Sequence, residues 1–205
     1  PLCDPFLMKD MHKAAQRVTH AIRTGERIAV FGDYDVDGIT ATCLLTDFLR
    51  RHGADCVSYI PGRLEEGYGL NPIAIRHLYA QNVTLIVTVD CGITCPNEVK
   101  RAVELGMRVI VTDHHQLGPE LPACSAVLNP LLGSYPFRRL CGAGVAFKLV
   151  HALGGLDAAL DRVDLAAIAT VADVVSLTGE NRYLVQMGLQ YLENTERAGL
   201  RALRE

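Results

Sequence analysis

Short apolar runs alternate with longer amphipathic segments along the first two thirds of the chain. A strand that is buried on both faces needs an unbroken apolar run, whereas a surface helix repeats apolar positions every three or four residues. Strands are predicted over residues 28–31, 56–60, 84–89, 108–112 and 125–128. Helices are predicted over residues 5–24, 39–52, 71–80 and 96–105. This alternation favours an α/β fold, with a mostly parallel sheet, right-handed crossovers and helices on its faces.

Beyond Tyr135 the alternation stops and only helical patterns follow. They span residues 144–153, 156–160, 165–172 and 182–192, and residues 198–205 resemble the start of another helix. We therefore expect one catalytic domain over residues 1–205. It would comprise an N-terminal helix (1–26), an α/β metal-binding core (27–135) and an all-helical part (136–205) that leads toward a second domain.

The composition indicates a soluble globular protein, because 49% of the 205 residues are hydrophobic and 21% are charged. No apolar run approaches the ~20 residues of a membrane span, and no basic and apolar leader opens the chain, so no membrane partner is expected. Seven cysteines without a C-x-x-C pair argue against a disulfide framework and a zinc ribbon. A cytoplasmic location is expected. Pro1 is not a natural start, which indicates a fragment or a processed chain.

The residues from Arg27 to Thr42 organise the chemistry of the chain. An apolar strand pattern ends at Phe31 and is followed by Asp33, Asp35 and Asp37 on alternate residues. Three carboxylates so close together repel one another, and no neighbouring cation in the sequence neutralises them. Binding of metal cations is the simplest way to tolerate this charge.

Two further predicted strands also end on ionisable residues. Asp90 follows one of them, and Asp113, His114 and His115 follow the next. Because ligands bind beyond the carboxyl ends of parallel strands, these residues are expected to meet the Asp cluster at one site. Asp90 alone could equally be a helix N-cap. Carboxylates with one or two imidazoles favour Mn²⁺ or Mg²⁺ over Zn²⁺, and their number suits a pair of ions that hydrolyse a phosphate ester.

Several other residues have two readings at this stage. Gly142 and Gly144 fit either a tight turn into a helix or backbone amides that face a phosphate. Asp173 fits either a metal ligand or an exposed helix end. Four arginines are candidate phosphate contacts: Arg63, Arg138, Arg139 and Arg182. The net charge of −3 does not exclude nucleic acid, because two divalent ions would add four positive charges at the site.

The D-Y-D-V-D-G segment also resembles the opening of a calcium-binding EF-hand loop. The twelfth position of such a loop is occupied here by Leu44 instead of Glu, and a strand precedes it. An EF-hand is therefore excluded.

Taken together, these motifs resemble the DHH phosphoesterase superfamily and, within it, the bacterial RecJ exonuclease family. The resemblance is carried, in order, by G-D-Y-D-V-D-G-I-T, R-L-E-E-G-Y-G-L-N-P, L-I-V-T-V-D-C-G-I, V-I-V-T-D-H-H, L-N-P, G-A-G-V-A-F-K-L and A-T-V-A-D-V-V-S-L-T-G-E-N-R. It implies a 5′-to-3′ exonuclease for single-stranded DNA in repair and recombination that needs two divalent cations, Mn²⁺ or Mg²⁺.

The resemblance also implies roles for individual residues. The implied metal ligands are Asp33, Asp35, Asp37, Asp90, His114 and Asp173, with Asp90 bridging the ions. His115 would contact the phosphate or support the site electrostatically, and Asp113 would orient the imidazoles. The implied phosphate contacts are Arg63 and Arg182, with Tyr68 close to the strand. Gly142 and Gly144 stay candidate substrate-binding residues on their position in the sequence alone.

RecJ proteins carry further substrate-binding domains that are not recognisable in this sequence, so weak activity is expected of this chain alone. A single-strand-binding protein and a recombination helicase are expected as partners besides single-stranded DNA. Two alternatives remain. One is a DHH phosphodiesterase for nanoRNA or cyclic dinucleotides, although its first motif usually has an H-x-N-x-D-x-D form. The other is a catalytically silent, Cdc45-like scaffold, although such proteins lack several of these ligands.

Overall fold

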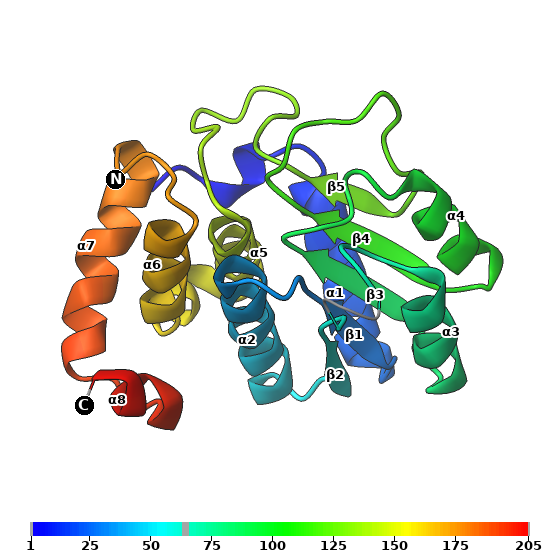
Figure 1. Ribbon diagram of the computed structural model, residues 1–205, viewed down its shortest axis with the longest axis horizontal. Helices are drawn as coiled ribbons and strands as arrows, with labels where there is room; N and C mark the ends of the chain where they lie inside the picture. The colour runs from blue at the N-terminus through cyan, green and yellow to red at the C-terminus, as the bar shows by residue number, and fades with distance from the viewer. Residues whose placement is uncertain (1, 63–65, 205) are drawn as a thin grey trace.

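The computed structural model describes residues 2–62 and 66–204 and contains, within these ranges, one five-stranded sheet (Figure 1). Every strand pairing is parallel, in the order β2-β1-β3-β4-β5. The strands are β1 (Ile28–Phe31), β2 (Cys56–Tyr59), β3 (Leu85–Val89), β4 (Arg108–Thr112) and β5 (Ala126–Leu128). The predicted α/β class with a parallel sheet is confirmed.

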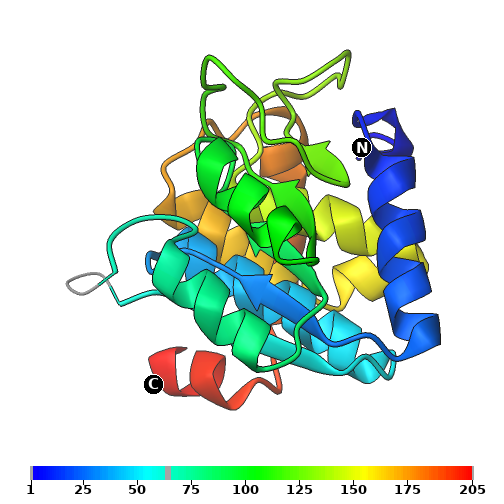
Figure 2. The ribbon, with the colours of Figure 1, turned by 90° about the vertical axis from the view of Figure 1, so that its right-hand side faces the viewer.

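Helices cover both faces of the sheet (Figures 1 and 2). The first half of the chain supplies a short 3-10 helix, η1 (Pro5–Leu7), then α1 (Met11–Thr24), α2 (Val36–Arg51), α3 (Pro72–Ala80) and α4 (Pro96–Glu104). The second half supplies α5 (Gly142–Leu160), α6 (Val163–Ala172), α7 (Gly179–Glu193) and α8 (Ala198–Arg204). The all-helical C-terminal part is therefore also confirmed.

Successive residues of each strand point to opposite faces and build two separate cores. In β1, Ile28 and Val30 pack with α1, α2 and α5, whereas Ala29 and Phe31 pack with α3 and α4. Helix α6 packs on α2 and α5, and α7 packs on α6, so the helical part continues the first core instead of forming a separate one.

Helix boundaries differ from the predicted ones in two places that matter. The predicted helix over residues 5–24 is wrong at its start, because the chain leaves helical geometry before Met11 and Asp10 adopts φ 63°. The Asp10 carboxylate there accepts a hydrogen bond from the Val127 amide of β5 at 3.3 Å, a long-range contact that local periodicity does not encode. Helix α2 starts at Val36 instead of residue 39, which places Asp37 in its first turn.

The strand order reverses direction between β1 and β3. After β1 the chain passes through α2 to β2 on one side, and then it crosses to β3 on the other side of β1. Neighbouring connections leave in opposite directions at this point, which is where parallel α/β sheets bind their ligands. The carboxylates that follow β1 and β3 therefore lie at the topological switch point.

Helix α5 is, within the described residues, the one helix long and apolar enough to span a membrane, with a mean hydropathy of 1.3. Half of that stretch is buried inside the protein. It contacts α1, α2, α6 and β3, and it contains the buried Lys148, as expected of a central core helix.

Candidate metal centre

The loop after β1 presents its carboxylates through a tight approach of the chain to itself. Asp35 is the N-cap of α2, and its Oδ1 accepts a hydrogen bond from the Gly38 amide at 2.8 Å. A Cβ atom on Gly38 would lie 2.4 Å from the Asp33 carbonyl oxygen, so only glycine fits at this position. Asp33 and Asp37 are buried, while Asp35 is exposed. The D-x-D-x-D-G motif thus places two buried carboxylates and one exposed carboxylate beside one another.

Asp37 is held by the N-terminus of α5. Its two carboxylate oxygens accept hydrogen bonds from the Gly142 amide at 2.6 Å and the Ala143 amide at 2.7 Å. The partial positive charge of the helix N-terminus attracts a carboxylate placed there. The α2 and α5 helices are therefore joined at the site by a bidentate contact.

Gly142 and Gly144 have packing roles in this arrangement. A Cβ atom on Gly142 would lie 2.5 Å from the Asp90 Cβ, and one on Gly144 would lie 3.2 Å from the Leu140 side chain. The Gly142 amide is engaged by Asp37 and Gly144 is buried, so of the two readings left open this geometry favours a tight turn into a helix over amides that face a phosphate. Gly142 instead allows α5 to approach Asp90 at the end of β3, and Gly144 allows it to pack against Leu140.

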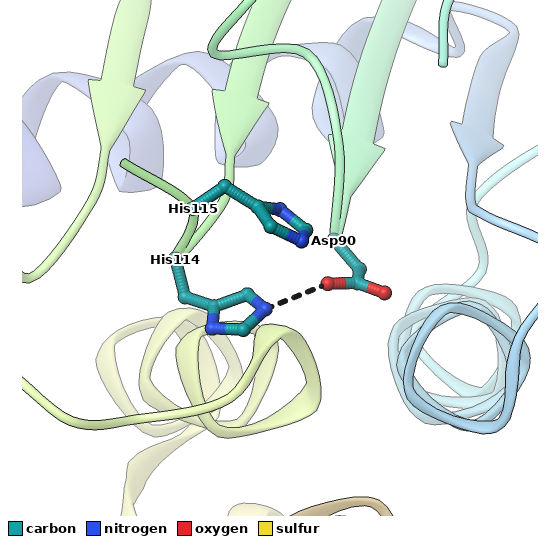
Figure 3. A group of neighbouring side chains, drawn as sticks. All are labelled: Asp90, His114 and His115. Atoms are coloured by element: carbon teal, nitrogen blue, oxygen red, sulfur yellow. Dashed lines mark ion pairs between the residues drawn. The ribbon is translucent and has the colours of Figure 1, made fainter. Parts of the chain in front are cut away.

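Asp90 occupies the centre of the site at the end of β3. It is 1% exposed and adopts a left-handed backbone conformation, with φ 60°. Such strain in a residue other than glycine concentrates at functional sites. Asp90 Oδ1 lies 3.1 Å from His114 Nε2 (Figure 3). Neither Asp90 oxygen nor this nitrogen has a hydrogen-bond partner among the described residues.

Asp113 orients the two histidines that follow it at the end of β4. Its Oδ1 accepts hydrogen bonds from the backbone amides of His114 and His115 at 2.8 and 3.1 Å, and it lies 2.6 Å from His115 Nδ1. Its Oδ2 accepts a hydrogen bond from the Ile93 amide at 3.0 Å. Burial would raise the pKa of Asp113, but these hydrogen bonds, the one with the His115 side chain foremost, lower it. The hydrogen bond with Asp113 in turn raises the pKa of His115.

Asp173 reaches the site from the C-terminal end of α6. Its Oδ2 lies 3.8 Å from His114 Nε2, and Asp37 Oδ2 lies 3.6 Å from the same nitrogen. The side chain of Asp173 is 25% exposed. Of the two readings left open for Asp173, the structure places this residue within the cluster.

The side chains form three overlapping groups whose ligand atoms lie within 4.8 Å of one another. These groups are Asp33, Asp35 and Asp90; then Asp90, His114 and His115; and then Asp37, His114 and Asp173. Asp90 and His114 each belong to two groups, and of these two residues only Asp90 has a carboxylate with two oxygens, as a ligand between two ions requires. Burial, together with the neighbouring carboxylates of Asp37 and Asp35, raises the pKa of Asp90 far above its usual value.

These residues fit divalent cations. The donor set consists of carboxylates and imidazoles without thiolates, as Mn²⁺ and Mg²⁺ prefer. One oxygen of Asp33, both oxygens of Asp90 and Nε2 of His114 are buried without a hydrogen-bond partner among the described residues. Buried polar atoms are nearly always paired, so their convergence on one point indicates a ligand that is not a protein group.

The predicted substrate contacts are only partly located. The Tyr68 hydroxyl lies 3.2 Å from His115 Nδ1 and 3.4 Å from the Asp90 carbonyl oxygen, so this residue borders the site. Arg63 lies outside the described residues. Arg182 is exposed on α7, and no contact with the cluster is seen for it in the described structure.

One supporting residue was not predicted. Asn129 follows β5, is fully buried, donates a hydrogen bond from Nδ2 to the His115 carbonyl oxygen at 3.0 Å, and accepts one from the Leu131 amide at 2.9 Å. It fixes the loop that carries the two histidines. The position of a polar residue directly after a parallel strand is the signal that marked Asp90, and it marks Asn129 equally.

Comparison with known proteins places this arrangement in a family. The DHH family, N-terminal domain, matches residues 27–175. The chain is 48% identical over 202 residues to the single-stranded-DNA-specific exonuclease RecJ of Bacillus subtilis. The aligned residues make up 98% of this chain and 26% of that protein. It is 40% identical over 216 residues to the same exonuclease of Escherichia coli, and this alignment covers 97% of this chain and 37% of that protein. The chain therefore spans about a quarter to two fifths of these relatives.

Comparison with solved structures also matches this chain to RecJ exonucleases. A crystal structure of exonuclease RecJ bound to manganese matches with a TM-score of 0.92 at 43% identity, over 99% of this chain and 53% of that one. RecJ of Thermus thermophilus in complex with Mn²⁺ matches with a TM-score of 0.87 at 39% identity, over 99% of this chain and 30% of that one. CDC45 of Entamoeba histolytica matches at 14% identity with a TM-score of 0.59, over 90% of this chain and 38% of that one, a likeness of fold alone.

Proposed function

Because the chain belongs to the DHH family, we propose that it is the catalytic unit of a metal-dependent phosphodiesterase, a 5′-to-3′ exonuclease for single-stranded DNA in repair and recombination. The observation that carries the proposal is the convergence of side chains from three strand ends and α6, with both Asp90 oxygens and His114 Nε2 lacking hydrogen-bond partners in the described structure. Single buried atoms without a partner also occur elsewhere in the described chain, as at Thr46 and Asn181, but here four converge on one point, from Asp33, Asp90 and His114, which a site made only to stabilise the fold would not require.

Two divalent cations are proposed as cofactors, Mn²⁺ or Mg²⁺. Asp33, Asp35, Asp37, Asp90, His114 and Asp173 would hold them, with Asp90 between the two. The relatives whose structures contain Mn²⁺ or Mg²⁺ support this choice of metal. When bound, such ions lower the pKa of water and neutralise charge that develops on a phosphate.

The remaining residues of the site are proposed to position the substrate. His115 faces the same space as Asp90 and His114 (Figure 3). Its raised pKa favours the imidazolium form, which would donate a hydrogen bond to a phosphate oxygen. Asp113 fixes that ring, and Tyr68 borders it. Arg63 and Arg182 remain proposed phosphate contacts, because the resemblance assigns them that role.

The test is a manganese-dependent digestion of single-stranded oligonucleotides labelled at the 5′ or the 3′ end. We expect mononucleotides to be released from the 5′ end, and we expect EDTA to abolish their release. Because the chain spans a fraction of its relatives, slow and non-processive action is expected, and a small phosphodiester serves as a second substrate. Absence of manganese-dependent hydrolysis of both substrates would contradict the proposal.

The two alternative functions have less support. A phosphodiesterase for nanoRNA or cyclic dinucleotides would share the ligand set, but the 36–48% identities are to exonucleases specific for single-stranded DNA. A Cdc45-like scaffold would not need the complete set of carboxylates and the histidine that the structure brings together. A cytoplasmic location, and interactions with a single-strand-binding protein and a recombination helicase, are proposed from the resemblance. Co-purification of such proteins from cells would test the interactions.

A further inference from the structure

A groove of about 300 Å³ opens beside the metal centre, between the loop that follows β5 and the segment that joins α6 to α7. His114 forms part of its wall, so the groove is continuous with the cluster of metal-ligating side chains. Its volume is at the lower end of the ~300–1,000 Å³ typical of small-molecule sites. The groove therefore has room for roughly one nucleotide unit next to the reacting group.

Charge distinguishes this groove from the centre that it adjoins. Arg138 and Arg139 line it together with the polar Gln116 and Ser176, and no carboxylate is found among its described lining residues. Arg139 Nη1 donates a hydrogen bond to Ser176 Oγ at 3.0 Å, and Arg138 Nη2 donates one to the Gly133 carbonyl oxygen at 2.9 Å. Each guanidinium has five N–H donors, so both retain donors for a ligand.

The opposite wall contains a strained residue. Val174 directly follows Asp173, is 85% exposed and adopts φ 57°, a conformation that is unfavourable for a β-branched side chain. Strain of this kind persists where the surrounding structure enforces it, and such positions cluster at ligand sites. The left-handed backbone of Val174 places the Asp173 carboxylate in the metal centre and the apolar Val174 side chain on the wall of the groove.

We propose that this groove binds the nucleotide unit next to the scissile phosphodiester, with Arg139 and Arg138 as ligands of its phosphate and Val174 against its sugar. This inference rests on the proposed nuclease function. A strand whose scissile phosphate lies at Asp90 and His114 must continue into an adjoining space. The guanidinium groups in this groove supply the fork geometry that matches phosphate oxygens.

The experiment compares two substrates with the same reacting bond. The dinucleotide TpT has one phosphodiester, whereas the trinucleotide TpTpT has a neighbouring phosphate as well. We expect Arg139→Ala to reduce the preference for TpTpT over TpT, expressed as kcat/KM with Mn²⁺, by about tenfold. The loss is expected mainly in KM. Arg23→Ala, which removes an exposed arginine of α1 outside the groove, is the matched control for loss of charge and should leave the preference unchanged.

A second variant separates binding of phosphate from support of the loop. Ser176→Ala removes the hydroxyl that receives the Arg139 hydrogen bond but keeps the guanidinium charge. A small effect of Ser176→Ala is expected. If it instead reproduces the full effect of Arg139→Ala, then Arg139 acts by holding the segment that follows α6, and the proposed phosphate contact is wrong.

Binding of a labelled oligothymidylate in Ca²⁺ provides a readout that does not need hydrolysis. If Arg139 binds a phosphate, Arg139→Ala should bind the oligothymidylate more weakly. The slope of log K against log[salt] should become less negative by about 0.7, for one lost phosphate contact. The wild-type protein could hydrolyse neither substrate and still bind the oligothymidylate more tightly than Arg139→Ala. That result would contradict the nuclease function but support the groove as a binding site for a nucleotide. If hydrolysis occurs but Arg139→Ala changes neither the substrate preference nor the affinity, the proposal for the groove is overturned.

Discussion

Asp90 and Glu180 are both buried carboxylates, 1% and 2% exposed, yet their surroundings differ completely. Glu180, in the first turn of α7, forms an ion pair with Lys148 of α5. It also accepts hydrogen bonds from the Tyr135 hydroxyl at 2.7 Å and the Cys3 amide at 2.8 Å. Lys148 donates a further bond to the Cys3 carbonyl oxygen at 2.8 Å. Asp90, in contrast, accepts no hydrogen bond on either oxygen among the described residues, and its close charged neighbour is His114, whose Nε2 lies 3.1 Å from Oδ1.

The comparison shows that burial of charge alone does not identify a functional site. The Glu180 network is saturated by protein groups and joins the N-terminal segment, α5 and α7. In the Asp90 cluster, buried oxygens lack hydrogen-bond donors among the described residues. The protein tolerates the left-handed backbone of Asp90 and the repulsion between its carboxylate and those of Asp37 and Asp35. Because buried polar groups are normally paired, unsaturation is the feature that indicates binding. Substitutions in the two regions should therefore affect different properties.

The largest effect is expected from Asp90→Asn on catalysis. This change removes the charge of Asp90, the carboxylate that two ligand groups share, while keeping its shape. We expect kcat/KM for a manganese-dependent phosphodiester substrate to fall at least a thousandfold, about 4 kcal/mol of transition-state stabilisation. The measurement is a steady-state assay with Mn²⁺ titrated to saturation. Retention of more than a tenth of the activity would show that Asp90 is not a metal ligand.

A large effect on stability is expected from Lys148→Met. The substitution leaves Glu180 buried without its cation, which costs about 3–5 kcal/mol when one partner of a buried pair is removed. Denaturant unfolding of the metal-free protein measures this loss. The double substitution Lys148→Met with Glu180→Gln removes both charges, and it should cost clearly less than the sum of the single changes. Strict additivity would mean that the two residues do not form an energetic unit.

A smaller loss of activity is expected from Asp113→Asn. An amide cannot place an oxygen on both the Ile93 amide and the His115 ring as the carboxylate does. Residues that orient metal ligands contribute about 10–100-fold to affinity or activity, and this range is expected for the loss in kcat/KM or in Mn²⁺ affinity. Asn129→Asp keeps a side-chain oxygen for the Leu131 amide but loses the bond to the His115 carbonyl oxygen, which provides a test from the other side of the loop. If neither variant affects activity, the histidines do not depend on this support.

Sequence patterns predicted most of this site because its parts follow a topological rule. Asp33, Asp90 and His114 each follow an apolar strand, and parallel strands bring such residues to one edge. The support of Asp37 was not predictable, because its partner amide, that of Gly142, is 105 positions away and is a backbone group common to all residues other than proline. The Glu180 network was also missed, since a buried Lys148 in an apolar helix has no local signature of its partner.

The smallest effect predicted here is a gain of stability, and it sharpens the comparison most directly. In the absence of metal, Asp90 is held beside Asp37 and Asp35, and repulsion and burial both disfavour its charge. Asp90→Asn should therefore stabilise the metal-free protein by about 1 kcal/mol, the order of the cost of leaving one buried polar group unsatisfied. Millimolar Mn²⁺ should reverse the ranking, because only a protein that binds the ion gains stability by mass action.

The measurement is the thermal unfolding of the wild type and of Asp90→Asn, each in EDTA and in Mn²⁺. Glu180→Gln is the matched control, because it neutralises a carboxylate of similar burial in the saturated network. It should destabilise the protein both with and without metal, while the shift caused by Mn²⁺ stays equal to that of the wild type. If Asp90→Asn were also destabilising in EDTA, Asp90 would support the fold as Glu180 does, and the distinction between the two buried carboxylates would be lost.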